Sequence, residues 1–237
     1  MPASPCPNAS ATLEAHQTAR LTIGQLTAIL RRSGALWLPG SRSLVVADLH
    51  LGKSERIARR QGHLLPPYET AETLDRLTAE IAALDPAEVI CLGDSFDDTA
   101  AATRLGQGQG QRLAELVRRR QWIWLAGNHD PRPAGHGGQS CAELVRGGTV
   151  FRHIARLESE RPEVSGHYHP KARIEHRGRR IQRPCFLGDQ RRLILPAFGC
   201  YTGGLDAQDP VFDPLFPHGA RLWLTGRRIT QLPRHAS

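Results

Sequence analysis

A series of side chains that could ligate a metal lies along this 237-residue chain, most of them directly after an apolar segment. They are Asp48, His50, Asp94, Asn128, His129, His153, His167 and His169. Imidazole nitrogens together with carboxylate and amide oxygens suit borderline divalent ions such as Mn²⁺, Fe²⁺ or Zn²⁺. Any one of these residues alone is more often a surface or hydrogen-bonded group than a ligand. Their recurrence along the chain predicts a metal centre, and their number is sufficient for two ions.

The apolar segments in front of these residues predict a parallel sheet. Three short apolar runs precede candidate ligands, at residues 44–47, 87–92 and 121–126. Helical segments lie between them, and this alternation is typical of a right-handed parallel α/β core. Sheets of this kind place their sites at the carboxyl ends of the strands. A glycine stands directly before Asp94, Asn128 and His167, which fits a backbone that must turn tightly there.

The first half of the chain also predicts the helices that cover this sheet. Apolar residues at helical spacing predict helices over residues 21–32 and 69–84, and we also expect helices over the basic segment at residues 54–61 and over about residues 111–120. Ser54 is the expected N-cap of the second helix, and Asp85-Pro86 is expected to end the third. Residues 35–39 and 43–47 predict two short strands joined by a Pro-Gly turn, and residues 106–110 predict a loop.

The second half predicts a different kind of sheet. Beyond a Pro- and Gly-rich loop at residues 131–138, short strand-like runs alternate with turn residues. We expect strands over residues 149–155, 163–165, 171–176, 179–187, 191–196, 220–225 and 227–232. This antiparallel or mixed sheet should pack face to face against the first one, with helices outside. We see no linker that divides the chain, so we expect a single domain at residues 18–237 after a flexible leader at residues 1–17.

Composition limits the partners and the compartment. The net charge of +8 favours an anionic partner, nucleic acid first, although enzymes without a polymer substrate are often basic too. The five cysteines are odd in number and form no Cys-x-x-Cys pair, which argues against a disulfide framework and indicates a cytoplasmic protein. We expect no membrane association, because no run approaches the ~18 apolar residues that a bilayer span needs.

The chain carries four motifs in an order that resembles the calcineurin-like metallophosphoesterase family. They are Asp-x-His at 48–50, Gly-Asp-x-x-Asp at 93–97, Gly-Asn-His-Asp at 127–130 and Gly-His-x-His at 166–169. The resemblance spans roughly residues 44–170. It implies a four-layer α/β/β/α sandwich in which two mixed sheets pack face to face with flanking helices. It also implies two divalent metal ions, with Mn²⁺ favoured over Fe²⁺ or Zn²⁺.

The resemblance assigns a role to each candidate residue. The two ligand sets would be Asp48, His50 and His169 for one ion and Asn128, His153 and His167 for the other. Asp94 would bridge the ions, and a hydroxide between them would attack phosphorus. His129 takes the place of the general acid that protonates the departing oxygen, and Asp130 that of the carboxylate orienting it. Asp97 takes a supporting rather than a ligating place.

The C-terminal part of the chain narrows the resemblance. Residues 193–199 and 201–204 resemble the bacterial ligase-associated DNA damage response endonucleases. That subgroup implies hydrolysis of phosphodiester bonds in single-stranded DNA during repair, alongside a DNA ligase or helicase; a homodimer is compatible with the sequence. The alternative is a phosphodiesterase or pyrophosphatase of a small molecule, such as a cyclic nucleotide or a nucleotide sugar. A scaffolding protein that has lost catalysis is a third interpretation, against which the complete ligand set argues.

Four further residues are candidates for binding the substrate. Lys53 and Arg56 closely follow the first motif and could contact phosphates, and Tyr168 and Tyr201 could stack on bases. A solvated helix face or an exposed loop is the alternative explanation for the two cations. Aromatic residues make up only 5% of the chain, which weakens the argument for stacking.

Overall fold

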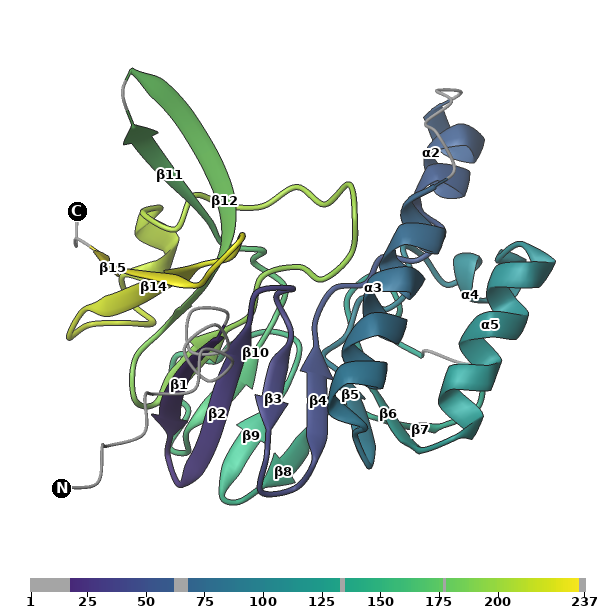
Figure 1. Ribbon diagram of the computed structural model, residues 1–237, viewed down its shortest axis with the longest axis horizontal. Helices are drawn as coiled ribbons and strands as arrows, with labels where there is room; N and C mark the ends of the chain where they lie inside the picture. The colour runs from purple at the N-terminus through teal and green to yellow at the C-terminus, as the bar shows by residue number, and fades with distance from the viewer. Residues whose placement is uncertain (1–17, 62–67, 133–134, 177, 235–237) are drawn as a thin grey trace, which may run out of the picture.

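Two mixed β-sheets lie face to face, and the α-helices cover the outer side of one of them (Figure 1). The structure is a computed structural model that describes residues 18–61, 68–132, 135–176 and 178–234. The expected N-terminal leader, residues 1–17, lies outside the described residues. The arrangement of sheets and helices confirms the expected α/β sandwich.

The first sheet joins an antiparallel half to a parallel half. Its strands lie in the order β1 (Thr18–Ile23), β2 (Leu26–Arg31), β3 (Leu36–Leu38), β4 (Ser43–Val46), β5 (Glu88–Cys91), β6 (Gln121–Leu125) and β7 (Gln139–Cys141). Strands β1 to β4 pair antiparallel, whereas β4 to β7 pair parallel. Every residue of β4 and β5 is buried, as expected for strands covered on both faces. The carboxyl ends of β4, β5 and β6 therefore meet at one edge, where the first three ligand motifs begin.

Helices cover the outer face of this sheet (Figure 1). They are α2 (Lys53–Gln61), α3 (Glu69–Leu84), α4 (Ala101–Arg104) and α5 (Gln107–Arg118). Leu74, Leu77 and Ile81 form the buried stripe of α3 and share one core with the outward side chains of the parallel strands. The helix ends at Leu84 and is capped by Asp85, which has a φ of 43° and whose amide donates to the carbonyl of Ile81. Within the described residues, no helix has the length and apolarity to cross a bilayer.

The second sheet is mixed as well. Its strands lie in the order β15 (Thr230–Arg234), β14 (Ala220–Leu224), β12 (Arg179–Gly188), β13 (Arg192–Ile194), β10 (Glu163–Ser165), β9 (Thr149–Phe151) and β8 (Leu144–Arg146). The three central strands β13, β10 and β9 pair parallel, and the others pair antiparallel. Strand β11 (Lys171–His176) pairs with β12 alone, and the two project as a hairpin (Figure 1).

The main core lies between the two sheets. Val45, Ile90 and Ile123 of the first sheet share an apolar cluster with Phe151 and Phe186 of the second. The outer side of the second sheet packs against a short layer that contains a 3₁₀ turn, Pro210–Phe212, instead of long helices. The fourth layer is thus present but reduced, and its Phe212 packs against Tyr168 of the loop that carries His167 and His169.

The helix expected over residues 21–32 is wrong, because this segment forms the β1–β2 hairpin. Its leucines and isoleucines fit a helical period, but burial along β2 alternates, with Ala28 and Leu30 turned inward. Gly24 adopts a φ of +57° in the turn between the strands. A glycine at such an angle favours a tight turn, and the β-branched residues around it favour strands.

Other expectations differ in detail. Helix α2 begins at Lys53, so Ser54 is not its N-cap; the Ser54 hydroxyl instead donates to a Glu69 carboxylate oxygen at 2.8 Å. Helix α5 begins at Gln107, which makes most of the expected loop at residues 106–110 helical. Strands β7 and β8 and helix α4 were not expected, since they are short and their sequences lack an apolar pattern. The remaining strands agree with expectation to within a few residues at their ends.

Candidate metal centre

Residues with positive φ angles gather at the carboxyl-terminal edge of the first sheet. Five candidate ligands have φ values in the left-handed region, namely Asp48 at 54°, His50 at 45°, Asp94 at 45°, His167 at 72° and His169 at 47°. Residues other than glycine rarely adopt this region, and holding each there costs about 1–3 kcal/mol. Strain of this kind clusters at functional sites because the surrounding structure holds side chains in a required position.

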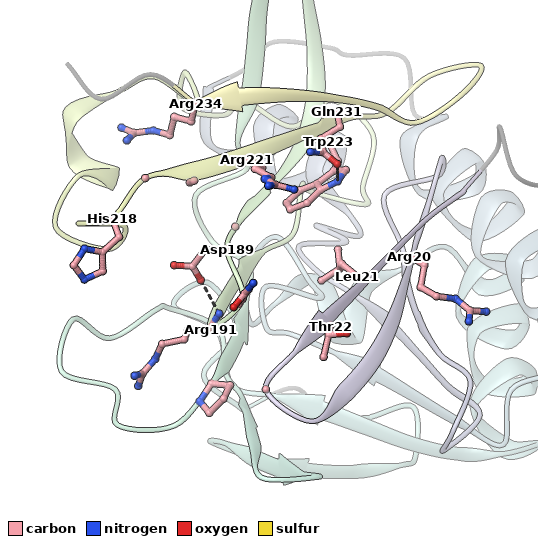
Figure 2. Close-up of a pocket in the computed structure, with 16 residues that line it drawn as sticks. Arg20, Leu21, Thr22, Asp189, Arg191, His218, Arg221, Trp223, Gln231 and Arg234 are labelled. Atoms are coloured by element: carbon pink, nitrogen blue, oxygen red, sulfur yellow. Dashed lines mark hydrogen bonds between the residues drawn. The ribbon is translucent and has the colours of Figure 1, made fainter.

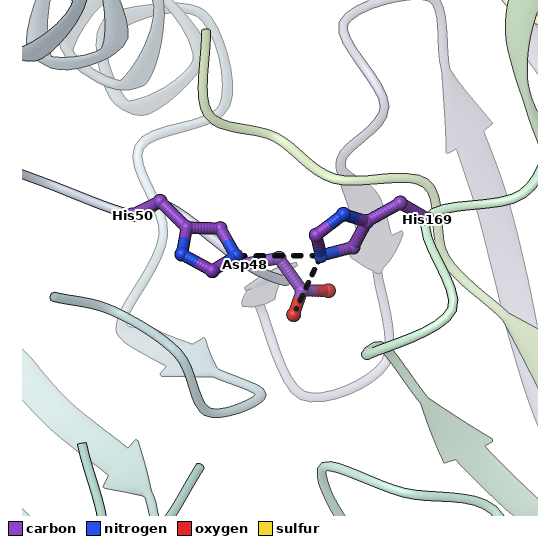
Figure 3. Close-up of side chains that lie close together, drawn as sticks. All are labelled: Asp48, His50 and His169. Atoms are coloured by element: carbon purple, nitrogen blue, oxygen red, sulfur yellow. Dashed lines mark hydrogen bonds and ion pairs between the residues drawn. The ribbon is translucent and has the colours of Figure 1, made fainter. Parts of the chain in front are cut away.

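The first cluster comprises Asp48, His50 and His169 (Figure 3). The Nε2 atoms of His50 and His169 lie 3.4 Å apart, and Nε2 of His169 lies 3.2 Å from Oδ1 of Asp48. Asp48 Oδ1 is buried and has no hydrogen-bond partner among the described residues. Two imidazole nitrogens and an unsatisfied carboxylate oxygen that face one point fit the donor set of a divalent ion.

Asp97 holds His50 in the orientation that a ligand needs. Oδ1 of this fully buried carboxylate lies 2.9 Å from Nδ1 of His50, an ion-pair contact without hydrogen-bond geometry, and its negative charge favours the tautomer with the proton on Nδ1 and Nε2 free for the metal. Arg56 donates to the other carboxylate oxygen, and Nζ of Lys53 lies 3.9 Å from Oδ1. Burial raises the pKa of Asp97, but the contacts with His50 and Arg56 outweigh it and lower the pKa below its usual value.

The second cluster comprises Asp94, His153 and His167, with Asn128 beside them. Nε2 of His153 lies 3.3 Å from Oδ2 of Asp94, 2.8 Å from Oδ1 of Asn128 and 3.2 Å from Nδ1 of His167. Nδ1 of His153 lies 2.8 Å from the carbonyl of Leu92, so the proton sits on Nδ1 and Nε2 faces the cluster. Burial lowers the pKa of His153, but the hydrogen bond to Asp94 and the charge of Asp48 raise it overall.

The two clusters are interlocked. Asp48 accepts a hydrogen bond from the amide of His167 at 2.9 Å, and its Oδ1 lies 3.8 Å from Nδ1 of His153. The carbonyl of Asp94 accepts from the amide of His50 at 2.9 Å. Burial raises the pKa of Asp94, but the hydrogen bond and charge of His153 hold it at about 2. Asp94 is therefore an anion between two groups of histidines.

Glycines next to the ligands allow this close packing. A Cβ atom on Gly93 would lie 2.7 Å from the ring of His153, and one on Gly166 would lie 2.5 Å from Oδ2 of Asp48. A Cβ atom on Gly127 would overlap the backbone and side chain of Asp94. Each of these glycines therefore precedes a candidate ligand at a position where any larger residue would clash with the site.

A family model described as calcineurin-like phosphoesterase matches residues 41–212 of the chain. The chain belongs to this family. A crystal structure of the Pseudomonas putida nuclease MPE matches with a TM-score of 0.73 and 27% sequence identity, covering 91% of this chain and 100% of that one. Yfce, a phosphoesterase from E. coli, matches at 11% identity with a TM-score of 0.38, covering 81% of this chain and 99% of that one. No curated protein matches the chain.

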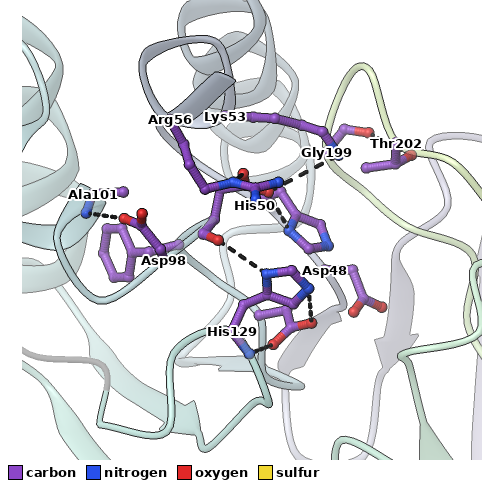
Figure 4. Close-up of polar contacts among 12 residues, drawn as sticks. Asp48, His50, Lys53, Arg56, Asp98, Ala101, His129, Gly199 and Thr202 are labelled. Atoms are coloured by element: carbon purple, nitrogen blue, oxygen red, sulfur yellow. Dashed lines mark hydrogen bonds and ion pairs between the residues drawn. The ribbon is translucent and has the colours of Figure 1, made fainter. Parts of the chain in front are cut away.

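In this phosphoesterase, His129 lies at the rim of the centre (Figure 4). Its amide donates to Oδ1 of Asp94 at 2.8 Å, and its ring lies 5.1 Å from that of His50. Nδ1 of His129 lies 3.0 Å from the carbonyl of Asp97, an acceptor that fixes a proton on Nδ1. Nε2 lies 4.0 Å from Oδ2 of Asp94 and points toward the clusters.

The expectation that Asp130 orients His129 is not what these contacts show. One oxygen of Asp130 accepts a hydrogen bond from the amide of Phe96 at 3.0 Å, and the other is buried without a hydrogen-bond partner among the described residues. Burial raises the pKa of Asp130 to about 7. The group at Nδ1 of His129 is the Asp97 carbonyl, a backbone acceptor that residue types alone do not reveal.

The four candidate substrate-binding residues of the phosphoesterase lie around the metal centre, but they differ in their exposure and in the contacts that they make. Lys53 and Arg56, on α2, both approach Asp97, so Arg56 is already engaged in an ion pair. The half-buried ring of Tyr168 packs at 5.1 Å from His167 and 5.5 Å from Phe212. Tyr201 is 47% exposed on the loop after β13.

A cavity of about 860 Å³ lies at another place in the phosphoesterase (Figure 2). Leu21, Thr22 and Trp223 line it where β1 faces β14, together with arginine side chains at its rim. None of the candidate metal ligands lines this cavity, so the cavity provides no evidence for the proposed metal centre.

Proposed function

We propose that this chain is a dinuclear-metal-dependent phosphodiesterase that cleaves DNA, in single strands and endonucleolytically, as part of DNA repair. The observation that carries the proposal is the pair of interlocked His and Asp clusters at one sheet edge in a calcineurin-like phosphoesterase. One ion would be held by Asp48, His50 and His169. The other would be held by Asn128, His153 and His167, with Asp94 reaching both ions.

Two bound ions would neutralise charge on the phosphoryl oxygens and lower the pKa of a water molecule that attacks phosphorus. The protein's own contribution is to place the groups around that reaction. The Leu92 carbonyl and the Asp97 carboxylate direct the Nε2 atoms of His153 and His50 inward. Lys53 adds a positive charge at the edge of the first cluster, where it can bind a second phosphate of the substrate.

His129 is the proposed general acid. The Asp97 carbonyl can accept only the Nδ1 proton, so the second proton of the imidazolium sits on Nε2, on the side of the clusters. From there it can pass to the oxygen that leaves phosphorus. The ring then returns to the neutral form with its Nδ1 proton still held.

DNA is the proposed substrate for two reasons. The net charge of +8 suits a polyanion, and the Pseudomonas putida protein that matches over its whole length is a nuclease. The resemblance of residues 193–204 to ligase-associated DNA damage response endonucleases supports a role in repair, with a DNA ligase or helicase as partner. Mn²⁺ is the proposed ion on the strength of the family resemblance, and the donor set of imidazole and carboxylate without thiolate is compatible with it, as it is with Fe²⁺ and Zn²⁺.

The test compares three substrates with the Mn²⁺-loaded protein. These are circular single-stranded DNA, linear duplex DNA and bis-p-nitrophenyl phosphate, each at low salt. Linearisation of the circle, faster than cleavage of the duplex, is the expected result and can only come from an endonuclease. Turnover of the small ester without DNA cleavage would refute the nuclease activity and leave a small-molecule phosphodiesterase.

A further inference from the structure

A second cavity, of about 240 Å³, lies beside the metal centre. Its polar lining includes Arg32, Ser33, Arg76, Lys171, Tyr201 and Thr202. The volume is below the about 300–1,000 Å³ of sites that enclose a whole small molecule. A cavity of this size suits one group of a larger ligand.

The charge of the cavity is uncompensated. Arg76 donates to the carbonyl of Ser33 at 2.6 Å and stacks 4.7 Å above the ring of Phe198, both neutral partners. Lys171 donates to the carbonyl of Thr202 at 2.8 Å. Arg32 is exposed and forms no ion pair with a described residue, whereas its neighbour Arg31 is paired with Glu80 at 2.8 Å. No carboxylate is among the described residues that line the cavity.

The cavity is joined to the metal centre by the backbone. The amide of Gly199, in its wall, donates to the carbonyl of Asp48 at 3.1 Å, and Lys171 follows the ligand His169 by two residues. A Cβ atom on Gly199 would overlap the carbonyl oxygen of Leu49, so this wall of the cavity packs directly against the backbone between the ligands Asp48 and His50.

We infer that this cavity is a subsite for a backbone phosphate of the DNA strand, next to the phosphate that is cleaved. The inference rests on the proposed function and adds the direction in which the strand leaves the metals, past Lys53 and Lys171 toward Arg32 and Arg76. The guanidinium group of Arg76, held in place by neutral partners, can offer paired donors to phosphate oxygens, and the exposed Arg32 adds a second positive charge. The exposed ring of Tyr201 at the rim is placed to stack on a base of the same strand.

The test uses the variant Arg32→Gln, because this exposed side chain can be changed without disturbing the core. Arg118→Gln is the matched control, since it removes an exposed arginine at the end of α5, on the outer face of the first sheet. For each protein, kcat/KM is measured with a single-stranded oligonucleotide and with bis-p-nitrophenyl phosphate over a range of salt. Removing one phosphate-binding cation from the subsite should lower the ratio of DNA to small-ester efficiency about threefold to tenfold and reduce the salt slope by about one.

Arg118→Gln should keep the wild-type ratio, and Arg32→Glu should lower it further than Arg32→Gln. Equal ratios for Arg32→Gln, Arg118→Gln and wild type would overturn the subsite while leaving the nuclease activity in place. An equal loss on both substrates in Arg32→Gln would also overturn it, because the effect would then arise at the metals. A wild-type protein that hydrolyses only the small ester would overturn the subsite and the proposed function together.

Discussion

At the scale of single residues, the centre depends on which nitrogen of each histidine is held by the protein. The Asp97 carboxylate holds Nδ1 of His50, and the Leu92 carbonyl holds Nδ1 of His153. Nε2 of each ring therefore faces the metal site. In metalloproteins, the group that contacts the second nitrogen of a histidine ligand usually fixes its tautomer and orientation in this way. Residue types identified the histidines, but two of the groups that orient rings are backbone carbonyls, which have no sequence signature.

Asp94 and His129 should separate metal binding from catalysis. Asp94→Ala removes the carboxylate that lies against His153 and accepts from the His129 amide, so we expect loss of bound metal and of activity. His129→Ala should keep the metals, because His129 is in neither proposed ligand set, and should reduce kcat by a factor of about 10²–10⁴. Metal content by atomic emission, measured beside the rate, distinguishes the two outcomes. Equal metal loss in both variants would contradict the assigned roles.

At the scale of elements, the parallel strands of the first sheet could be predicted from the sequence, whereas the antiparallel strands at its edge could not. Continuous apolar runs ending in Asp48, Asp94 and Asn128 can hardly be anything other than buried strands that deliver side chains to one edge. Residues 21–32 carry leucines that fit either a helix or a strand, and only the partner strands decide between them. The short β7, with the sequence Gln-Ser-Cys, is a strand because β6 offers it an edge, not because of its own residues.

The junction between β5 and its loop yields a prediction for Gly93. An added methyl group would lie 2.7 Å from the His153 ring, at a φ of +80° that alanine resists. We expect Gly93→Ala to lower the free energy of unfolding by at least about 1–3 kcal/mol. For a chain of this size, that loss corresponds to a drop in Tm of roughly 3–10 °C. The variant should also bind metal more weakly. Gly108→Ala in α5 is the control: it meets no atom within 4 Å, so it should be neutral or stabilising by up to about 1 kcal/mol. Calorimetry with and without Mn²⁺ measures both effects, and a Gly93→Ala protein that melts like wild type would refute the steric argument.

At the scale of the whole molecule, the sandwich concentrates buried charge at one edge. Asp48, Asp94, Asp97 and Asp130 are all buried there, close to the histidines of both sheets. Buried carboxylate oxygens without a hydrogen-bond partner, such as Oδ1 of Asp48 and Oδ1 of Asp130, oppose folding, and bound metal ions stabilise the state that contains them. The stability of the fold and the occupancy of the centre should therefore be linked, and chelation should lower Tm.

The pH dependence of the metal-free protein should reveal this linkage through Asp130. Its pKa is raised by burial to about 7 in the folded state, against about 3.9 for an unfolded aspartate. The folded state therefore binds one more proton between these values, so the Asp130 contribution to stability is fully present below about pH 4 and is lost as the pH rises through about 7. Asp130→Asn removes this titration while keeping an oxygen for the Phe96 amide.

Urea unfolding of both proteins in a chelator, at several values between about pH 5 and pH 8, measures the difference. We expect wild type to lose stability relative to Asp130→Asn by about 2.5–3 kcal/mol between pH 5 and pH 8, with a slope of up to about 1.4 kcal/mol per pH unit below pH 7. Saturating Mn²⁺ should shrink the difference, because nearby cations favour the charged carboxylate. Parallel stability curves for the two metal-free proteins would show that Asp130 is ionised throughout, and hence that the buried edge is better solvated than its packing indicates.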